Sequence, residues 1–273
     1  MKYWLRNFLY APGRERLLGI LASFYVSGRA QRPTHVFFDK GVWVHRSKEG
    51  SVTDRHVNHR LSLAGYERVM NDYWFSVYEP KPADIVVDIG AGKGEETYAF
   101  SKRVGPGGRV ISVEAHPQTF RCLVKLIEHN GLTNVVPVHA AICEKQHDVF
   151  INNPEWDQQG SIVAAASGLR IPGLTLDALV KNLAVARIDF LKMNIEGAEA
   201  LAIQGMSQSI QNTKAVCISC HDFLGDSCSN EQMRTKAKVA AFLEQNGFRI
   251  FSRDNDPRPY IRDQLNAFNE RLL

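Results

Sequence analysis

The sequence predicts an α/β protein with a doubly wound, mostly parallel sheet of seven strands, preceded by a smaller cap made of a helix and a β-hairpin. From residue 83 onward, apolar runs of strand type alternate with stretches of helix type, the pattern of parallel sheets covered by helices. The run DIVVDIG, residues 84–90, suits a strand buried on both faces. Pro80 and Pro82 mark the change in pattern, so we predict a cap over residues 1–80 and a main domain over residues 81–273.

The composition is that of an ordinary globular protein whose basic residues gather near the N-terminus. Of 273 residues, 44% are hydrophobic and 23% charged, and no apolar run is long enough to suggest a membrane span. The net charge is +4, but residues 1–32 alone carry +5, which leaves −1 for residues 33–273. The main domain therefore offers no basic groove, and we expect no nucleic-acid partner.

The N-terminal segment combines basic residues with an apolar helical face. The i, i+3, i+4, i+7, i+8 spacing of one helix face is followed by Leu17, Ile20, Leu21, Phe24 and Tyr25. We expect this face to pack on the main domain or on a second subunit, so homodimerisation through the helix is one interpretation. An anchor at a membrane surface is the other, because the segment also contains Trp4, Phe8, Tyr10, Lys2, Arg6, Arg14 and Arg16.

The rest of the cap is predicted to be one hairpin followed by a helix. THVFFDKGVWVHRS, residues 34–47, indicates two strands joined at Asp39-Lys40-Gly41, where the glycine suits a hairpin turn. The aromatic-rich stretch over residues 60–80 is compatible with a helix. A cap of this kind often covers a ligand site in α/β enzymes.

The main domain contains seven predicted strands with helices between them. Strands are expected at residues 84–90, 109–115, 134–142, 188–194, 215–221, 248–253 and 264–270, the last of them antiparallel. Helices are expected at residues 94–104, 117–131, 175–183, 199–206 and 231–247. Candidates for substrate contact are an insertion over residues 143–174, with Trp156, Gln159 and Ser161, and a lid over residues 221–232. Ligands of such sheets bind beyond the carboxyl ends of the strands, so the site is expected there.

The turn after the first main-domain strand indicates a positively charged ligand. Asp88 lies near the end of that strand, and the turn has the spacing G-x-G-x-G, formed by Gly90, Gly92 and Gly94. In the dinucleotide fingerprint, G-x-G-x-x-G, the third glycine lies one residue further along. Asp88 and Glu95 beside the turn disfavour a phosphate and favour a cation, such as the sulfonium and ammonium groups of S-adenosylmethionine.

Glu114 ends the second main-domain strand, the next strand along the chain after that of Asp88. A carboxylate at this point can accept hydrogen bonds from both ribose hydroxyls of an adenosyl ligand. A tight strand-to-helix turn that binds no ligand is the alternative interpretation.

These motifs resemble those of a known enzyme family. VVDIGAGKGEE, residues 86–96, with VISVEAHP, residues 110–117, is similar to motifs I and II of Rossmann-like methyltransferases that depend on S-adenosylmethionine. LTLDALVKNLAVARIDFLKMNIEGAEALAIQGM, residues 174–206, resembles the FkbM family among them, whose T-L-D-x-L segment is followed by K-[IM]-D-[VI]-E-G-x-E. The resemblance covers residues 80–253 and implies methyl transfer to a hydroxyl of a small molecule, sugar or glycolipid.

The resemblance also implies a role for each cofactor-binding candidate. Asp88 and the three turn glycines would hold the methionine part of S-adenosylmethionine, and Glu114 would hold its ribose. Ala141 and Ile142, after the third strand, would line the adenine.

One position departs from the family pattern. Asn194 stands where the family usually has Asp, at the end of the fourth strand, where the methyl group is transferred. In some related enzymes such an Asp binds Mg²⁺, which lowers the pKa of the acceptor hydroxyl. Asn contributes no charge, so a strong Mg²⁺ site is not expected, and a general base must take the proton. The candidates are Glu196, His221 and Asp222, with His221 preferred for its pKa near neutrality, although His221 and Glu196 also suit purely structural roles.

The five cysteines indicate free thiols in a reducing compartment. CISCH, residues 217–221, matches the C-x-x-C-H pattern of haem attachment, but its two cysteines should point to opposite faces of a buried strand. A zinc site built from Cys217, Cys220, Cys228 and His221 is disfavoured as well. The number of cysteines is odd and no pair spacing is repeated, which favours a cytoplasmic localisation. If the N-terminal helix is an anchor, the protein would also associate with a membrane.

Other functions stay open on the sequence alone. A protein that binds S-adenosylmethionine without catalysis would explain Asn194, and a methyltransferase acting on RNA or protein would share the cofactor motifs. The charge of −1 over residues 33–273 weighs against the RNA version. A dehydrogenase is the third alternative, because the glycine spacing of the dinucleotide fingerprint differs from the spacing found in this sequence.

Overall fold

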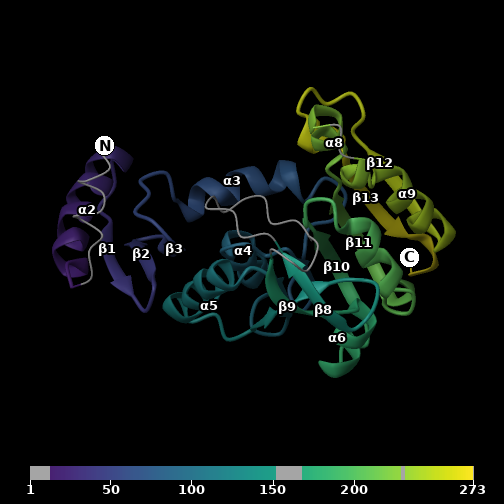
Figure 1. Ribbon diagram of the computed structural model, residues 1–273, viewed down its shortest axis with the longest axis horizontal. Coiled ribbons are helices and arrows are strands. Elements are labelled where there is room, and N and C mark those ends of the chain that lie inside the picture. Colours follow the sequence, from purple (N-terminus) through teal and green to yellow (C-terminus); the bar gives the residue numbers. More distant parts are fainter. Residues whose placement is uncertain (1–12, 152–167, 229–230, 273) are drawn as a thin grey trace.

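The computed structural model describes residues 13–151, 168–228 and 231–272. Several sequence candidates lie outside the described residues: Lys2, Trp4, Arg6, Phe8, Tyr10, Trp156, Gln159 and Ser161. The described part is elongated, with the cap at one end of the long axis and the C-terminal strands toward the other (Figure 1).

Seven strands of the described residues form the central sheet, as the sequence predicts. In sheet order they are β12 (Phe248–Ser252), β13 (Gln264–Asn269), β11 (Thr213–Ser219), β10 (Ile188–Met193), β4 (Ile85–Ile89), β5 (Arg109–Glu114) and β6 (Val135–His139). β13 is antiparallel to both of its neighbours, and the other pairs are parallel. The chain builds outward from β4 to β6 and then returns to place β10 on the other side of β4. A ligand crevice is expected at this switch point, beyond the carboxyl ends of the strands.

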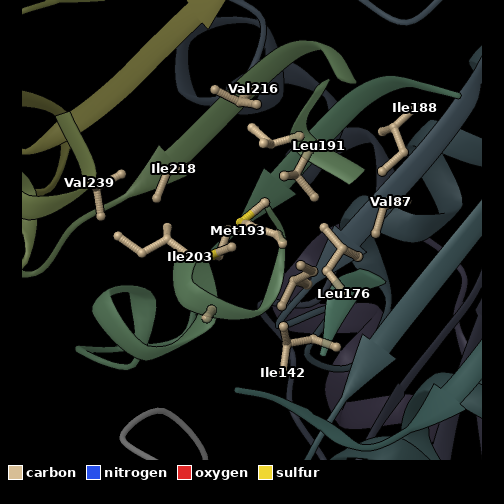
Figure 2. Close-up of a cluster of buried hydrophobic side chains, with 14 of the residues drawn as sticks. Val87, Ile142, Leu176, Ile188, Leu191, Met193, Ile203, Val216, Ile218 and Val239 are labelled. Atoms are coloured by element: carbon tan, nitrogen blue, oxygen red, sulfur yellow. The ribbon is translucent and has the colours of Figure 1, made fainter. Parts of the chain in front are cut away.

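Helices cover both faces of the central sheet. One face is covered by α6 (Leu176–Asn182), α7 (Glu199–Ala202) and α9 (Lys236–Gln245), and the other by α3 (Leu63–Tyr73), α4 (Glu95–Val104) and α5 (Pro117–Asn130). Val87 of β4, Leu176 of α6 and Val239 of α9 all belong to the first cluster, part of which Figure 2 shows. Val86 packs with Phe190 in the second. Because strand side chains alternate between faces, a strand covered on both sides must be apolar throughout, which is why β4 is evident in the sequence.

The third predicted strand is divided between two sheets. β6 ends at His139, and β7 (Ala141–Ile142) pairs instead with β9 (Leu169–Leu174). β8 (His147–Ile151) completes this second sheet, antiparallel to β9. The predicted insertion therefore contains a small sheet that contacts β5 through β7.

The helix expected over residues 199–206 is shorter than predicted. It consists of the single turn α7, followed by a 3-10 turn at Ile203–Gly205. At Gly205 the chain passes close to Cys143, where a Cβ would come within 2.2 Å of the carbonyl oxygen. The backbone here is fixed by this close approach rather than by helix propensity.

The helix expected over residues 231–247 begins later than predicted. Glu231–Met233 forms a 3-10 turn, and α9 starts only at Lys236. Asp222 Oδ1 accepts the backbone N–H groups of Thr235 and Lys236 and so caps α9 at that point. Asp222 itself opens α8 (Asp222–Cys228), a helix within the segment predicted as a lid.

The cap has one strand more than the sequence predicts. β1 (His35–Asp39) and β2 (Val42–Ser47) form the expected hairpin, and β3 (Gly50–Asp54) pairs with β2. β3 is fastened to the main domain by Asn130 of α5, whose side-chain oxygen accepts the backbone N–H of Ser51 and whose side-chain nitrogen donates to the Ser51 carbonyl. Because GSVTD is short and lacks an apolar run, β3 has little sequence signal.

The N-terminal helix buries the face opposite to the one that the sequence predicts. In α2 (Glu15–Ala30) the buried residues are Leu18, Gly19, Ala22 and Val26. The predicted face is 50–77% exposed at Leu17, Ile20, Leu21, Phe24 and Tyr25. Small residues allow this, since α2 lies so close to β1 that a Cβ on Gly19 would be 2.8 Å from the Val36 carbonyl oxygen. The expectation that the predicted face packs on the main domain is therefore wrong. None of the helices in the described ranges, α2 included, has both the length and the apolar character needed to cross a membrane.

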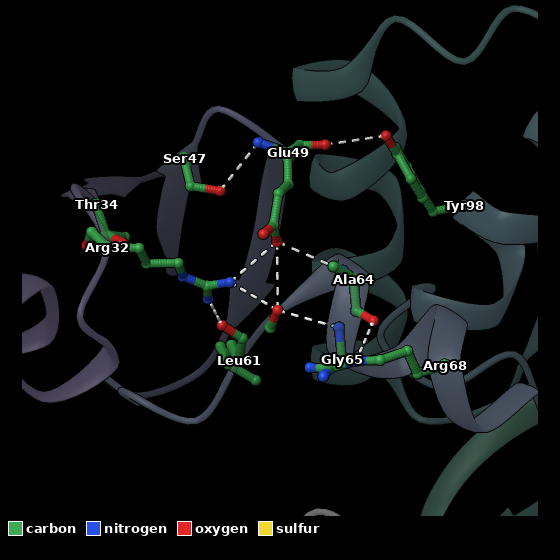
Figure 3. Close-up of polar contacts among 10 residues, drawn as sticks. Arg32, Thr34, Ser47, Glu49, Leu61, Ala64, Gly65, Arg68 and Tyr98 are labelled. Carbon is green, nitrogen blue, oxygen red and sulfur yellow. Dashed lines mark hydrogen bonds and ion pairs between the residues drawn. The ribbon is translucent and has the colours of Figure 1, made fainter.

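Polar contacts connect α2, the hairpin and α3. Arg32, just after α2, donates to Glu49 Oε2 at 3.0 Å and to Ser62 Oγ at 2.6 Å (Figure 3). Ser62 is the N-cap of α3 and accepts a backbone N–H from its first turn. Tyr98 of α4 donates its hydroxyl proton to the Glu49 carbonyl, which joins this network to the main domain.

Candidate functional site

A cavity of about 290 Å³ lies at the carboxyl ends of β4, β5 and β10, where the strand order reverses. Seven of the sequence candidates line it: Gly90, Gly92, Glu114, Ala141, Ile142, Asn194 and Glu196. Four others, Asp88, Gly94, His221 and Asp222, are not among its lining residues. The cap adds Arg55, which follows β3, and Tyr66 of α3. The site therefore depends on both predicted parts of the chain.

The three turn glycines have different roles, although all have positive φ. At Gly90 a Cβ would lie 2.0 Å from the Asn194 carbonyl oxygen, so this glycine lets β4 and β10 end close together. At Gly94 a Cβ would lie 2.7 Å from Leu123 of α5. At Gly92 a Cβ would meet no atom within 4 Å, so this residue presents bare backbone to the cavity.

Asp88 is fully buried and lies beneath the cavity surface. Its carboxylate forms an ion pair with Lys192 at 2.9 Å and accepts a hydrogen bond from Thr97. Lys192 Nζ also donates to the Gly90 carbonyl at 2.8 Å and lies 5.1 Å from the centre of the Trp74 ring. Although burial disfavours its charge, nearby carboxylates keep the pKa of Lys192 above the usual value. Asp88 therefore acts on the glycine turn through Lys192.

Glu114 presents a carboxylate whose oxygens already hold two backbone groups. Oε2 accepts the N–H of Gly92 at 2.9 Å, and Oε1 accepts the N–H of His116 at 2.8 Å. Burial raises the pKa of Glu114 to about 7, although these two bonds oppose the shift. A carboxylate has about four lone-pair sites, so two remain for ligand hydroxyls.

Glu95, the first residue of α4, has a buried oxygen without a hydrogen-bond partner. The residue is 5% exposed and lines the cavity, and its Oε1 is the unpaired atom. Burial is the main cause that raises the pKa of Glu95 to about 7; the charge of Lys93 opposes the shift, and the charge of Glu96 adds to it. The pKa of the Tyr66 hydroxyl is raised as well, by burial and then by Glu95. An unpaired buried carboxylate oxygen is costly, so this wall of the cavity suits a cation or a hydrogen-bond donor.

Asn194 and Glu196 continue the wall beyond the end of β10. The backbone N–H of Asn194 donates to the Ile89 carbonyl, which holds the segment against β4. Glu196 has a φ of +50°, a left-handed conformation that is uncommon for residues other than glycine. Burial raises the pKa of Glu196 to about 7; the charge of His221 opposes the shift, and Glu199 adds to it. Glu196 is therefore a strained, cavity-lining carboxyl able to exchange a proton near neutrality.

His221 is held in a buried polar group behind Glu196. Its Nδ1 lies 3.1 Å from Glu199 Oε1, and the two residues are 6% and 0% exposed. Glu199 also accepts the Thr235 hydroxyl at 3.0 Å and the backbone N–H of Gly197. His221 thus lies near the cavity acids without belonging to the cavity lining.

Part of the cavity lining is apolar. Ala141 and Ile142 of β7 lie there with Ala115 and with Ile151 of β8. The first two were expected from the sequence to line an adenine, whereas Ile151 comes from the predicted insertion. The contribution of β8 has no local sequence signal, because it depends on how β7 and β9 pair.

Lys192, Arg55 and Tyr66 are among the cavity residues that the sequence analysis missed. Lys192 had a usable signal, since it is a lysine within an apolar strand, and the structure pairs it in register with Asp88. Arg55 and Tyr66 had none, because their approach to the cavity depends on how the cap packs against the main domain.

Thiols and metal-ligand groups give no second site in the described residues. Four buried cysteines of the described residues form no disulfide: Cys122, Cys143, Cys217 and Cys220. Cys217 and Cys220 belong to apolar clusters on opposite faces of the sheet, as strand alternation predicts. No three His, Cys, Asp or Glu side chains of the described ranges are grouped as metal ligands.

Curated relatives match this chain over short stretches. The catalytic subunit of a tRNA (adenine(58)-N(1))-methyltransferase from Cryptococcus neoformans is 42% identical over 60 residues, which is 22% of this chain and 14% of that protein. Demethylmenaquinone methyltransferase from Lactobacillus johnsonii is 29% identical over 114 residues, 42% of this chain and 43% of that protein. The chain therefore matches less than half of the length of either relative.

The family model and a solved structure match far more of the chain. The chain resembles the methyltransferase FkbM from Methylobacillus flagellatus KT with a TM-score of 0.50 and 17% identity, over 76% of this chain and 50% of that one, which shows a shared fold. A model of the methyltransferase FkbM domain matches residues 88–250, more than half of the chain. This span contains the glycine turn, Glu114 and Glu196, and it confirms the family resemblance of the sequence motifs. The chain belongs to the methyltransferase FkbM family and has the Rossmann-like fold of methyltransferases that depend on S-adenosylmethionine.

Proposed function

We propose that this protein transfers the methyl group of S-adenosylmethionine to a hydroxyl oxygen of a small molecule, a sugar or a glycolipid. One observation carries the proposal: three carboxyls, those of Glu95, Glu114 and Glu196, line one cavity with the bare backbone of Gly92. Burial raises the pKa of each carboxyl to about 7. Such groups attract a cationic ligand and can accept a proton at neutral pH, which a neutral hydroxyl acceptor requires.

The cavity residues fit S-adenosylmethionine in three places. Glu114 has free lone pairs for the ribose hydroxyls, and Ala141 and Ile142 offer an apolar wall for the adenine. The unpaired Oε1 of Glu95 suits the α-ammonium group, and the open side of Gly92 leaves room for the ligand. When bound, S-adenosylmethionine supplies an electrophilic methyl group on its sulfonium.

Asp88, Gly90 and Gly94 support the cofactor site from behind. Lys192 joins the Asp88 carboxylate to the Gly90 carbonyl, and Gly94 lets α4 approach α5. These three residues are therefore assigned to positioning the turn.

Glu196 is our choice of general base for the acceptor hydroxyl. It lines the cavity, and its pKa of about 7 leaves a large fraction ionised at neutral pH while keeping it basic enough to take a proton. Asn194, two residues earlier, can orient the acceptor through its amide without adding charge. His221 is assigned a positioning role, because it holds Glu199 and influences the pKa of Glu196 from behind the cavity wall.

The acceptor is proposed to be a small molecule or glycan rather than nucleic acid. Residues 33–273 carry a net charge of −1, and the cavity wall contains four glutamates, Glu95, Glu96, Glu114 and Glu196. Arg55, Lys93 and Lys192 line the same cavity, so its lining has no excess of positive charge with which to bind a phosphate backbone. Because one matched relative is a tRNA methyltransferase, RNA is included as an acceptor in the activity test below.

We further propose that residues 1–80 act as a cap completing the site on the domain over residues 81–273. Arg55 and Tyr66 support this, since both line the cavity from the cap side. Four buried cysteines of the described chain form no disulfide, which supports a reducing, cytoplasmic location.

A pair of matched glycine variants tests the cofactor site. Gly92 and Gly131 have φ of +57° and +60°, and at both a Cβ would meet open space, but only Gly92 lines the cavity. Calorimetric titration with S-adenosylmethionine is expected to give micromolar affinity for wild type and for Gly131→Leu, and no measurable binding for Gly92→Leu. Equal loss of binding in both variants would assign the effect to backbone strain and reject the proposed site.

A second experiment tests the general base. Release of S-adenosylhomocysteine is measured with a panel of sugar and small-molecule hydroxyl acceptors and with tRNA. Glu196→Gln is expected to lower kcat by about 10²- to 10⁴-fold while leaving cofactor affinity within a few fold. Tight cofactor binding with no turnover on any acceptor would instead favour a binding protein without catalysis, and turnover on tRNA alone would overturn the proposed acceptor class.

A further inference from the structure

The exposed side of α2 is the most extensive apolar helix surface in the described residues. Leu17, Ile20, Leu21, Phe24 and Tyr25 form a continuous strip along this helix, with Phe24 77% exposed. Figure 1 shows α2 at one end of the long axis, outside β1, with no described element beyond it. A large flat partner can therefore reach the strip without meeting the rest of the described molecule.

The orientation of this strip is fixed by the other side of the helix. Leu18, Ala22 and Val26 are buried against the hairpin. Ser23 Oγ accepts the backbone N–H of Val36 at 2.8 Å, and Ser27 Oγ accepts that of Thr34 at 2.9 Å. Rotating the helix to bury the apolar strip would break these bonds, so the exposure belongs to the folded state.

Basic side chains accompany the strip. Arg16 and Arg29 are exposed in the first and last turns of α2, and Glu15 is the only acidic residue of the helix. Arg32 is excluded from this group, because its guanidinium is engaged by Glu49 and Ser62. The helix thus presents an apolar strip with cations near both ends, the arrangement of helices that lie in an anionic membrane interface.

We propose that α2 docks this strip on the surface of an anionic lipid membrane, with Leu21 and Phe24 entering the interface and Arg16 and Arg29 contacting lipid headgroups. A second copy of the chain fits less well. The helix has 16 residues, and at 1.5 Å per residue it offers a strip about 24 Å long and about 10 Å wide, whereas stable dimers bury roughly 800 Å² per partner. A planar membrane needs no such area from one protein, because each inserted side chain contributes on its own.

Co-sedimentation of the full chain with vesicles tests the proposal. The probes are anionic vesicles, made of phosphatidylcholine and phosphatidylserine in a ratio of two to one, and neutral vesicles of phosphatidylcholine alone. Wild type is expected to bind the anionic vesicles, and binding is expected to weaken on the order of tenfold in Leu21→Gln/Phe24→Gln. Arg16→Gln/Arg29→Gln should weaken binding to anionic vesicles by a similar factor and leave binding to neutral vesicles unchanged, since each charge contributes near the surface.

Val69→Gln is the matched control, because Val69 is an apolar residue of α3 that is 48% exposed and outside the strip. It should bind vesicles as wild type does. No binding of wild type to anionic vesicles, or an equal loss in Val69→Gln, would overturn the proposal. So would a dimer in sedimentation velocity that dissociates in Leu21→Gln/Phe24→Gln, because the strip would then be an interface between copies.

Discussion

Lys192 shows how much of the site depends on a single buried charge. The residue is 1% exposed, and its ammonium group is shared by Asp88 and the Gly90 carbonyl. The Asp88 carboxylate also accepts a hydrogen bond from Thr97, whose hydroxyl is neutral. Removing the ammonium would therefore take away the charge that compensates this carboxylate in the core.

Lys192→Met is expected to destabilise the protein by about 3–5 kcal/mol, the range for a buried ion pair that loses one partner. Urea unfolding followed by circular dichroism measures this change. Lys181→Met, at an exposed lysine of α6, is the control and should change the free energy of unfolding by less than about 0.5 kcal/mol. A small effect at Lys192 would contradict the dependence of the Asp88 carboxylate on this ammonium group.

The raised pKa of Glu114 predicts a pH-dependent affinity for adenosyl ligands. In the ligand-free protein its pKa is about 7 instead of 4.5, so the carboxylate predominates above pH 7 and the neutral acid below it. Only the carboxylate can accept both ribose hydroxyls. Affinity for S-adenosylhomocysteine should therefore fall as pH decreases through about 7, by up to tenfold per pH unit. Titrations at pH 6, 7 and 8 measure this slope.

The same titrations on Glu114→Gln distinguish the contribution of Glu114 to the pH dependence from those of the neighbouring carboxyls. The amide does not ionise, so the contribution of Glu114 to the slope should vanish while overall affinity falls. Glu196→Gln is the parallel control, expected to keep the Glu114 slope. An unchanged slope in Glu114→Gln would place the titrating group elsewhere, with Glu95 the next candidate because its pKa is also about 7.

At the scale of elements, α2 is positioned by its smallest residues. Gly19 lies against the Val36 carbonyl, whereas Gly28, on the same helix, is exposed and a Cβ there would meet nothing within 4 Å. Neither has a left-handed φ, so alanine is compatible with both backbones. The two positions thus compare a packing glycine with a surface glycine in one helix.

Gly19→Ala is expected to destabilise the protein by about 1–3 kcal/mol, because the added methyl must push α2 away from β1. Gly28→Ala should leave stability unchanged or raise it by up to about 1 kcal/mol, since alanine is the better helix former. Hydrogen exchange of α2 and β1 amides measures both changes locally. Equal effects at the two positions would contradict the close packing of α2 on β1.

Elements that are mostly apolar and buried on both faces could be predicted from the sequence, and those whose packing depends on small or polar residues could not. β4, β10 and β11, with the sequences IVVDI, IDFLKM and TKAVCIS, are of the first kind and are evident without knowledge of their neighbours. For α2 the sequence predicted the wrong buried face. The apolar periodicity follows the large side chains, whereas the small residues Gly19 and Ala22 form the contact with β1. β3 and β8 were missed, since short mixed sequences become strands only through their partners.

At the scale of the whole molecule, α3 unites the cap with the main domain. Met70, 1% exposed, packs with Val86 of β4 and Phe100 of α4 in one apolar cluster. Asp72 near the end of α3 also pairs with Arg253 and Arg258 of the C-terminal region. The predicted boundary at residue 80 therefore falls between segments that share a core.

Because of this shared core, the chain is expected to unfold in one cooperative transition. Met70→Ala should shift the whole transition to lower urea concentration, corresponding to about 2–5 kcal/mol. Val69→Ala, the exposed neighbour on the same helix, should shift it by less than about 0.5 kcal/mol. Fluorescence and circular dichroism should report the same midpoint in each variant. Separate midpoints for the two probes would show that the cap unfolds independently.

The site could be predicted as far as it is local in sequence. Gly90, Gly92 and Glu114 lie close together in the sequence, on consecutive elements, and their spacing is enough to predict a site for an adenosyl ligand. Glu196 was a candidate because it follows the fourth predicted strand. We prefer it to His221 as the general base because it lines the cavity, and the spacing of residues in the sequence does not reveal this. Arg55 and Tyr66 required the packing of a separate part of the chain.

The order of these residues along the chain has a consequence for how such a protein can diversify. The glycine turn and Glu114 are encoded by one continuous stretch, and Arg55 and Tyr66 by an earlier one, yet all border the same cavity. Mutations in the earlier stretch can reshape one wall while the turn is inherited intact. If the proposed cofactor site is the one used, descendants of a common gene can in this way change the cavity wall without having to evolve that site again.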